Sequence, residues 1–380
     1  MLQIQLATLF ILFYIMLLQF ERCEFKNFIL IDDSFFSKNL ALIFTDCVFS
    51  NLTASKLFNY FSYIPIFTGI LFEFISSNIL IKNTEFSNLI LEYELFDMAY
   101  CQVFSKNTSM FNVVSDISFL VMVMKGSYSL QNLAYVNCSN GFLSLKNSNL
   151  SIDSSSFNNS LISVVSFPFS LIMVSSNTDQ NKINLNNSTF IGFSTLNNGS
   201  ILNIDEVKAN ITIYDCAFIG NVANYDGGAL YFYSSGNITI ESCVFIENEA
   251  DCGGAICYDD PVVSNHILYL QLISNSFQRN KAETSGGAIM LSYKIPLNFT
   301  PDDSIYEENI AGAYGDDCAS EPFRMLYLGD VPVKKQYSIN DWNDPPFITL
   351  RTASGIPINI VLIFVLVDYF YQTVNRTFVE

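Results

Sequence analysis

The candidates for acid–base or calcium chemistry in this chain are three of its pairs of adjacent aspartates: Asp259-Asp260, Asp302-Asp303 and Asp316-Asp317. Enzymes that cleave polysaccharides use clustered carboxylates, and calcium takes carboxylate oxygens as ligands. Each pair lies beside Pro or Gly in a turn-like context, where solvated aspartates are common. Because no basic partner recurs at a matching spacing, we favour solvated turns over catalytic or calcium-binding carboxylates.

Histidine and cysteine offer equally little for chemistry. The one histidine, His266, lies in an apolar run that ends at Leu270, where a structural role is favoured over that of a lone base. The nine cysteines include no C-x-x-C pair, which disfavours a zinc site. We therefore expect no catalytic, cofactor-binding or metal-binding residues and no cofactor, and we predict that the protein is not an enzyme.

Composition and charge narrow the partners further. Of the 380 residues only 14% are charged, and the net charge is −18. Such a chain repels phosphate backbones and offers no basic patch to anionic lipid, so nucleic acid is excluded as a partner and the acidity is assigned to solubility. The abundance of Phe, Ile, Tyr, Val and Thr favours β-structure.

The N-terminal run from Leu6 to Leu18 has the length and hydrophobicity of a signal-peptide core. No Lys or Arg precedes it and Glu21-Arg22-Cys23 makes a poor cleavage site, so an uncleaved anchor, or a buried strand or helix, stays open. About twelve Asn-x-Ser/Thr sequons favour the secretory route, although an Asn- and Ser-rich chain also generates them by chance. Examples are Asn51, Asn107, Asn137, Asn149, Asn158, Asn198, Asn210, Asn237, Asn298 and Asn375.

One sequence unit recurs four times between residues 210 and 320. Each unit has an aromatic residue, an asparagine three positions later, an alanine two further on and a glycine five or six residues after the asparagine. Successive aromatics are about 27 to 32 residues apart, which is the range of a solenoid repeat. The repeat positions are Phe218, Asn221, Gly227, Phe245, Asn248, Gly253, Phe277, Asn280, Gly286, Tyr306, Asn309 and Gly315.

A single unit cannot bury its apolar face, so stacked coils of parallel strands are the expected solution. Equivalent residues then stack: the aromatics form an internal ladder, and the asparagine amides form a second ladder at a turn. The Gly-Gly pair marks a turn where a Cβ would clash, and this interpretation outweighs a phosphate loop because no Lys-Ser/Thr follows.

Cys216 and Cys243 each precede the aromatic of their unit by two residues. They could form a disulfide or a stack of reduced thiols, and we favour the reduced stack. Arg279 and Lys281 flank an asparagine of the ladder and are expected to point outward.

Weaker copies of the unit precede the regular ones, and the pattern stops after residue 320. The chain is divided into a signal peptide or anchor (1–22), degenerate β-helix coils (23–205), regular repeats (206–320) and a C-terminal β segment (321–380). The fourth unit, with Gly315-Asp316-Asp317, is interpreted as the end of the array. The weaker copies are assigned to Phe36, Phe49, Phe86, Phe157, Phe190 and, for the Gly-Gly-Ala-Ile part, Asn198-Gly199-Ser200-Ile201.

The Phe-x-x-Asn and Gly-Gly-Ala-Ile/Leu pair, as in Phe218, Asn221 and Gly227-Gly228-Ala229-Leu230, resembles the chlamydial-type polymorphic outer-membrane protein repeat. The resemblance implies a right-handed parallel β-helix of the pectin-lyase-like class with an adhesive or surface-exposed role. The stretch from Asn309 to Pro322 is similar to the close of such arrays in large ciliate surface proteins. Those proteins usually continue into cysteine-rich and membrane-spanning parts.

The predicted fold is all-β, a right-handed parallel β-helix with a short C-terminal β segment that could belong to a β-sandwich. The favoured function is a non-enzymatic glycoprotein, secreted or at the cell surface, with an adhesive, structural or ligand-presenting role. Its expected partners are other surface proteins or glycans, and membrane association is expected through the N-terminal segment or a C-terminal continuation. The alternative is a carbohydrate-active β-helix enzyme, a polysaccharide lyase or glycoside hydrolase.

Overall fold

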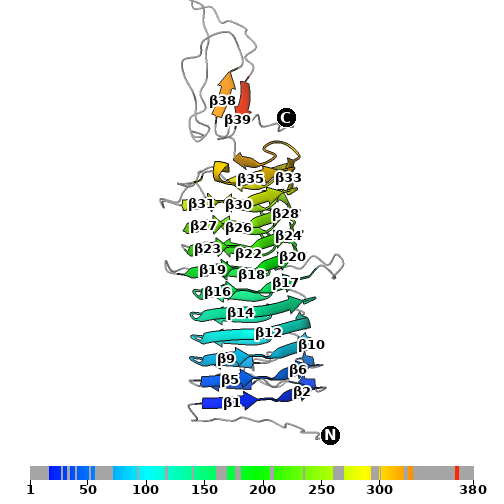
Figure 1. Ribbon diagram of the computed structural model, residues 1–380, viewed down its shortest axis with the longest axis vertical. Helices are drawn as coiled ribbons and strands as arrows, with labels where there is room; N and C mark the ends of the chain where they lie inside the picture. The colour runs from blue at the N-terminus through cyan, green and yellow to red at the C-terminus, as the bar shows by residue number, and fades with distance from the viewer. Residues whose placement is uncertain are drawn as a thin grey trace, which may run out of the picture.

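Parallel strands stacked coil upon coil make up most of the computed structural model (Figure 1). The stack rises from β1 near the N-terminus to β37, and the fold class predicted from the sequence, a parallel β-helix, is confirmed. The structure describes residues 17–26, 29–31, 35–38, 41–50, 53–55, 72–91, 94–115, 119–138, 141–159, 169–175, 181–205, 209–233, 236–259, 269–291, 299, 301–320, 324–327 and 364–367.

The largest sheet has 21 strands, all paired in parallel. Its strands alternate inward apolar and outward polar residues, as a half-buried strand should. In Asn210–Tyr214, for example, Ile211 and Ile213 are buried while Asn210, Thr212 and Tyr214 are exposed. The strands are β1 (Leu17–Glu21), β2 (Glu24–Lys26), β3 (Ile29–Ile31), β5 (Ala41–Thr45), β6 (Val48–Ser50), β7 (Thr53–Ser55), β9 (Asn78–Lys82), β10 (Glu85–Leu91), β12 (Gln102–Ser115), β14 (Ser127–Val136), β16 (Asn149–Asp153), β17 (Ser156–Asn158), β19 (Lys182–Asn186), β20 (Thr189–Ile191), β23 (Asn210–Tyr214), β24 (Ala217–Ile219), β27 (Asn237–Glu241), β28 (Val244–Ile246), β31 (Tyr269–Ile273), β32 (Ser276–Gln278) and β35 (Ile305–Glu307).

Two further parallel sheets complete the coils, the smaller of them only from Ser194 onward. The 11-stranded sheet consists of β4 (Phe35–Lys38), β8 (Phe72–Ile75), β11 (Phe96–Ala99), β13 (Val121–Met124), β15 (Leu143–Lys146), β18 (Ile172–Ser175), β22 (Leu202–Asp205), β26 (Leu230–Tyr233), β30 (Ile256–Asp259), β34 (Ile289–Leu291) and β37 (Cys318–Ser320). The five-stranded sheet consists of β21 (Ser194–Thr195), β25 (Val222–Ala223), β29 (Glu249–Cys252), β33 (Lys281–Ser285) and β36 (Ile310–Ala311). The core is one continuous cluster of buried apolar side chains that runs through the coils from Phe44 to Cys318.

The remaining described elements lie in the C-terminal part of the chain. A 3₁₀ turn, η1 (Pro301–Asp303), precedes the last coil, and β38 (Arg324–Tyr327) pairs antiparallel with β39 (Phe364–Val367) in the predicted C-terminal β segment. Of the predicted leader, residues 1–16 lie outside the described residues, and the following β1 pairs with β5. His266 also lies outside them.

Two of the weaker repeat copies were assigned wrongly. Phe36 lies in β4 of the 11-stranded sheet, opposite Glu73, whereas the aromatic column belongs to the 21-stranded sheet. The Gly-Gly-Ala-Ile copy is shifted by one residue, because Leu202, not Ile201, pairs with Leu230. The corner conformation with positive φ therefore falls on Gly199, at 56°, directly beneath Gly227 at 68°.

Candidate functional site

The repeat aromatics stack as a ladder of parallel rings inside the helix. Neighbouring ring centroids between Phe190 and Tyr306 are 4.8 to 5.1 Å apart, with interplanar angles of 7° to 8°. The intervening Phe218, Phe245 and Phe277 are fully buried. The column continues in register into the weaker coils, through Phe157 and Phe190 and, further down, Phe49 and Phe86. The spacing of the strands thus stacks the rings from Phe157 to Tyr306.

Replacing one aromatic ring in the middle of this ladder by an aliphatic side chain should destabilise the fold. Phe245 stacks on Phe218 and Phe277 at 4.8 Å on both sides. We expect Phe245→Leu to lower the free energy of unfolding by about 1–2 kcal/mol, through lost ring contacts and imperfect packing. Urea unfolding followed by circular dichroism measures the change, and a variant as stable as the parent chain would contradict it.

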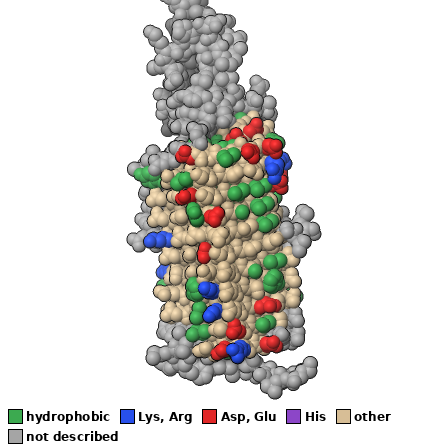
Figure 2. All heavy atoms as spheres, in the orientation of Figure 1, with side chains coloured by type: hydrophobic (Ala, Val, Ile, Leu, Met, Phe, Trp, Pro, Cys, Tyr) green, Lys and Arg blue, Asp and Glu red, His purple; other side chains and the backbone are tan. Residues whose placement is uncertain are grey.

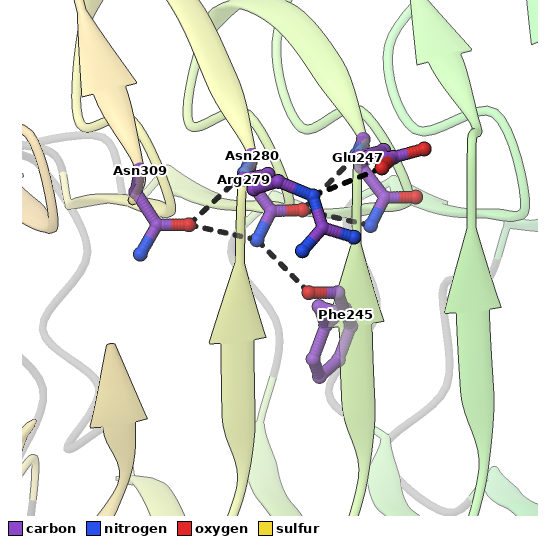
Figure 3. A network of polar contacts seen from close by, with 6 residues as sticks. Phe245, Glu247, Arg279, Asn280 and Asn309 are labelled. Atoms are coloured by element: carbon purple, nitrogen blue, oxygen red, sulfur yellow. Dashed lines mark hydrogen bonds and ion pairs between the residues drawn. The ribbon is translucent and has the colours of Figure 1, made fainter. Parts of the chain in front are cut away.

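The repeat asparagines form a second ladder, fully buried at a corner of the coil. The Oδ1 of Asn248 accepts hydrogen bonds from the backbone N–H and the Nδ2 of Asn221, at 3.1 and 3.0 Å. Its own Nδ2 donates to Asn280 Oδ1 at 2.9 Å and to the Phe218 carbonyl at 3.0 Å. The same contacts recur between Asn280 and Asn309, and Figure 3 shows them. Each amide is therefore held by the coils on both sides.

The Asp316-Asp317 pair ends this ladder. The Nδ2 of Asn309 donates to Asp317 Oδ1 at 3.0 Å, so a carboxylate accepts where the next asparagine would. Asp316 Oδ1 accepts the backbone N–H of Ala311 at 2.9 Å, an N–H that faces outward from the last coil. The two aspartates thus satisfy donors at the open end of the stack, which is how an exposed strand edge is protected. Their position agrees with the interpretation of this unit as the end of the array.

Removing the Asp317 acceptor should loosen the last coil. We expect Asp317→Ala to leave the nearly buried Asn309 amide short of one partner, to cost about 1 kcal/mol and to speed amide hydrogen exchange of Ile310 and Ala311. Asp317→Asn keeps an acceptor oxygen and is the matched control. Equal exchange rates in the alanine and asparagine variants would rule out this role for the carboxylate.

The repeat glycines all occupy the same corner. Gly227, Gly253, Gly286 and Gly315 have φ between 63° and 73°, a region that favours glycine. The second glycine of each pair is demanded by space instead. A Cβ on Gly254 would meet the Gly287 carbonyl oxygen and lie 2.6 Å from the Lys281 carbonyl oxygen. The Gly-Gly turn is thus a close approach of one backbone to the next.

The cysteines take part in a further hydrogen-bonded corner. Cys216 and Cys243 lie in adjacent coils as free thiols, and the Cys216 backbone N–H donates to Cys243 Sγ at 3.5 Å. In neighbouring coils the same acceptor is Ser188 Oγ or Asn275 Oδ1. A side-chain hydrogen bond with Cys243, together with burial, raises the pKa of the Cys216 thiol. The thiols therefore serve as short hydrogen-bonding side chains in a column that also uses Ser and Asn.

Burial of Cys138 predicts a loss of stability in alkali. Desolvation raises the pKa of this thiol from 9.0 to about 12, so the folded state keeps the proton that the unfolded chain releases. The contribution is complete below pH 9 and falls by about 1.4 kcal/mol per pH unit as the pH rises from 9 to 12. Cys138→Ser keeps an acceptor for the Val113 N–H, which now bonds the thiol at 3.4 Å, and should flatten this decline in urea titrations. A serine variant that declines as steeply as the parent chain would refute the assignment.

The other aspartate pairs do not converge in the described residues. Asp259 Oδ2 accepts the Tyr231 hydroxyl at 3.3 Å, and the backbone carbonyl of Asp303, the last residue of η1, accepts the Ser274 N–H at 2.9 Å. The described part of the chain does bring Asp226, Asp251 and Cys252 together. One carboxylate oxygen of each aspartate and the Cys252 Sγ lie within 4.8 Å of one another. Asp226 and Cys252 pair across adjacent coils, and Asp251 accepts a hydrogen bond from Thr284. This cluster could not be recognised in the sequence, because the two aspartates belong to different units.

The basic residues beside the ladder point into solvent. Arg279 Nε lies 2.9 Å from Glu247 Oε1 (Figure 3). Lys281 Nζ lies 2.5 Å from Glu249 Oε1, and all four side chains are about half exposed. Hydrogen bonding to Glu249 raises the pKa of Lys281. Exposed pairs of this kind contribute little to stability. They tie neighbouring coils on the outside of the corner, with the amide ladder behind them.

Comparisons with known proteins identify the repeat. No curated protein matches the chain, and none of the described helices is long and apolar enough to cross a bilayer. A family model matches residues 215–233, which carry Phe218, Asn221 and the Gly227-Gly228 turn. Those residues supply one rung of the aromatic ladder, one rung of the amide ladder and the close backbone approach. Residues 215–233 thus match the Chlamydia polymorphic membrane protein repeat, within a parallel β-helix.

Proposed function

We propose that the protein is a non-enzymatic, surface-exposed β-helix glycoprotein with an adhesive or structural role. The observation that carries the proposal is the outer face of the 21-stranded sheet, where columns of Ser, Thr and Asn run between scattered charged residues such as Lys182 and Glu241. In the matching repeat the aromatic, amide and glycine positions are all occupied in holding the coils together, so contact with a partner falls to the outward residues. Surface proteins and glycans are the partners that such a face suits.

The outer face consists of polar columns on neighbouring strands. Ser151, Asn184, Thr212 and Thr239 are paired in register from β16 to β27 and face outward. Asn210 and Asn237 lie in the next column, with a hydrogen bond of 3.1 Å between their side chains. Figure 2 shows that side chains other than charged and hydrophobic ones, with the backbone, cover most of this view. Hydroxyls and amides both donate and accept, so these columns can bind neutral polar groups through contacts that desolvate no charge.

Location is the sharpest test of this proposal. The full chain, tagged at its C-terminus and expressed in the cells that make it, should be stained on intact cells and removed by protease added outside. A tagged cytosolic protein, stained only after permeabilisation, is the control. Staining confined to the cytosol would overturn the proposal.

One observation favours a second candidate function, a carbohydrate-active enzyme. Asp226 and Asp251 bring carboxylate oxygens of adjacent coils within 4.8 Å, comparable to the roughly 5 Å between the carboxyl groups of retaining glycosidases. If these two residues are catalytic, the purified full chain should cleave a neutral glycan or a uronide, and Asp251→Asn should abolish the activity. Thr284→Val, which removes only the hydroxyl bound to Asp251, is the milder comparison.

A further inference from the structure

A groove opens on the outside of the 11-stranded sheet, at the junction between the weaker and the regular coils. Its volume is about 360 Å³. Met173 of β18 and Asn203 of β22, which pair in register, face outward as its floor. Phe169 and Ser170 line one side, Asn197 and Asn198 line another, and Tyr225 stands at the rim with 59% of its surface exposed.

The groove exists because the apolar side chains that pack on the outside of the 11-stranded sheet begin at Tyr231, one coil after Asn203. In the regular coils the outward residues that follow Asn203 in the column, Tyr231, Cys257 and Met290, are buried to 8% exposure or less. They pack in a separate apolar cluster that also contains Tyr314. Met173 and Asn203 precede this cluster and are only half-buried, so the junction leaves a recess with an apolar end and a polar end.

The polar groups in the groove have unused hydrogen-bonding capacity. Asn203 donates through Nδ2 to the Asn198 carbonyl at 3.1 Å, and Asn198 Oδ1 accepts the Asp226 N–H at 3.0 Å. Within the described part of the chain, Asn203 Oδ1, Asn198 Nδ2 and the Tyr225 hydroxyl make no hydrogen bond. An acceptor, a donor and a group that is both are therefore held on a rigid frame around one opening.

The lining also selects against charged ligands. None of the described residues that line the groove is charged, so an ion entering it would lose hydration with no opposite charge to compensate. The exposed ring of Tyr225 and the ring of Phe169 offer flat apolar surface beside the amides. A ligand that fits has an apolar face, several hydroxyl or amide groups at its edge, and no net charge.

We infer that this groove binds a neutral saccharide. A pyranose ring presents C–H groups on its face and hydroxyls around its rim, which matches an aromatic surface flanked by carboxamides. The volume lies at the small end of the range of ligand pockets, enough for one or two sugar rings. The inference names the ligand class of the proposed adhesive role and rests on that role for its biological meaning.

Two sources could supply the sugar. Asn198-Gly199-Ser200 is a sequon, and its Nδ2 has no hydrogen bond in the described structure, so a glycan attached to Asn198 would start inside the groove. The other source is the glycan of a partner surface. Both present the same chemistry to Tyr225 and Asn203.

The first arm of the test uses the full chain made in a host without N-glycosylation. Lactose, mannobiose and N,N′-diacetylchitobiose are titrated by ligand-observed NMR, with digalacturonate as the anionic comparison. We expect a neutral disaccharide to bind with a Kd of about 1 mM, and Tyr225→Ala to weaken binding at least about tenfold. Tyr214→Ala removes another exposed tyrosine, on β23, and should stay within about twofold of the parent chain.

The second arm uses the chain secreted from a glycosylating host. Glycopeptide mass spectrometry reports occupancy of Asn198, and endoglycosidase sensitivity is compared between the parent chain and Tyr225→Ala. An occupied and protected Asn198 that excludes free disaccharide supports the chain's own glycan as occupant. An unoccupied Asn198 with disaccharide binding supports a partner's glycan.

Two results would overturn the inference. One is the absence of neutral disaccharide binding up to about 10 mM, together with a glycan on Asn198 that is cleaved equally fast in the parent chain and Tyr225→Ala. The other is disaccharide binding that Tyr225→Ala leaves unchanged while circular dichroism shows both proteins folded. Because the first arm uses purified protein, it stands apart from the localisation experiment, and either idea can fail without the other.

Discussion

Replacing Asn248 by alanine is expected to lower the free energy of unfolding by about 4 kcal/mol. Its amide takes part in four hydrogen bonds, two from Asn221, one to Asn280 and one to the Phe218 carbonyl. Asn221, Asn248 and Asn280 are fully buried, so water cannot replace the lost partners without opening the corner. An unsatisfied buried polar group costs roughly 1–3 kcal/mol, and the substitution leaves the backbone N–H and Nδ2 of Asn221 and the Phe218 carbonyl short of a partner.

The chain offers a matched control for this substitution. Asn237 also donates through Nδ2 to an asparagine of the adjacent coil, Asn210, but both side chains are exposed. Water can replace that hydrogen bond, so Asn237→Ala should cost less than about 0.5 kcal/mol. Urea midpoints of the two variants and the parent chain measure the difference. If the two variants are equally stable, the buried ladder is not what holds the coils in register.

Gly254→Ala is expected to destabilise the fold by at least about 3 kcal/mol. Gly254 does not need a positive φ, so the effect isolates the close approach of neighbouring coils. The added Cβ would meet the backbone of Gly287 and Lys281, and backbone in a hydrogen-bonded stack cannot give way as a flexible side chain can. The coils would have to separate at this corner, with loss of the Gly254 N–H bond to the Gly286 carbonyl, 3.0 Å long.

Gly220→Ala is the contrasting variant. Gly220 has a φ of 59°, and a Cβ there would have no neighbour within 4 Å. It should cost only about 1 kcal/mol, the strain of the left-handed conformation. Thermal unfolding of the two alanine variants separates steric from conformational cost. A smaller loss at Gly254 than at Gly220 would contradict the close-approach account.

The regular repeat could be predicted from the sequence because each of its positions tolerates few residue types. A buried amide that bonds both neighbours must be asparagine-like, and a backbone contact such as that at Gly254 admits only glycine. Because of these constraints, the same residue types recur at a regular spacing in the sequence. The fold class followed directly from them.

The weaker coils were harder to predict because their constraint is looser. Met110 and Tyr135 occupy the aromatic column between Phe86 and Phe157, and neither was identified from the sequence. Any large apolar side chain fills the interior there, so no motif marks the position. The column of side chains that accept a backbone N–H from the preceding coil was hard to predict for the same reason. Cys243, Ser188 and Asn275 all fill this role, so no single residue type recurs at the repeat spacing.

The groove and the Asp226–Asp251 cluster could not be predicted at all. Phe169 and Tyr225 belong to different coils, and their meeting depends on how the loops of successive coils stack. The number of residues between strands varies from coil to coil, so sequence separation does not reveal which loop residues lie side by side. The Asn198 sequon is the only sequence motif among the described residues of the groove, and it indicates only that a glycan can be attached there.

The amide ladder has a direction. From Asn221 to Asn280 each Nδ2 donates one hydrogen bond to the asparagine of the next coil and a second one back to a phenylalanine carbonyl of the preceding coil. Each Oδ1 accepts only from the N-terminal side, so the amide C=O groups all point the same way along the axis of the helix. The positive end of this row meets the Asp317 carboxylate, which complements it in charge as well as in geometry. Each rung contacts only the rungs before and after it. A unit can therefore be gained or lost between Asn221 and Asn309 without a change in either terminus, which makes the length of the rod a property that gene duplication can adjust freely.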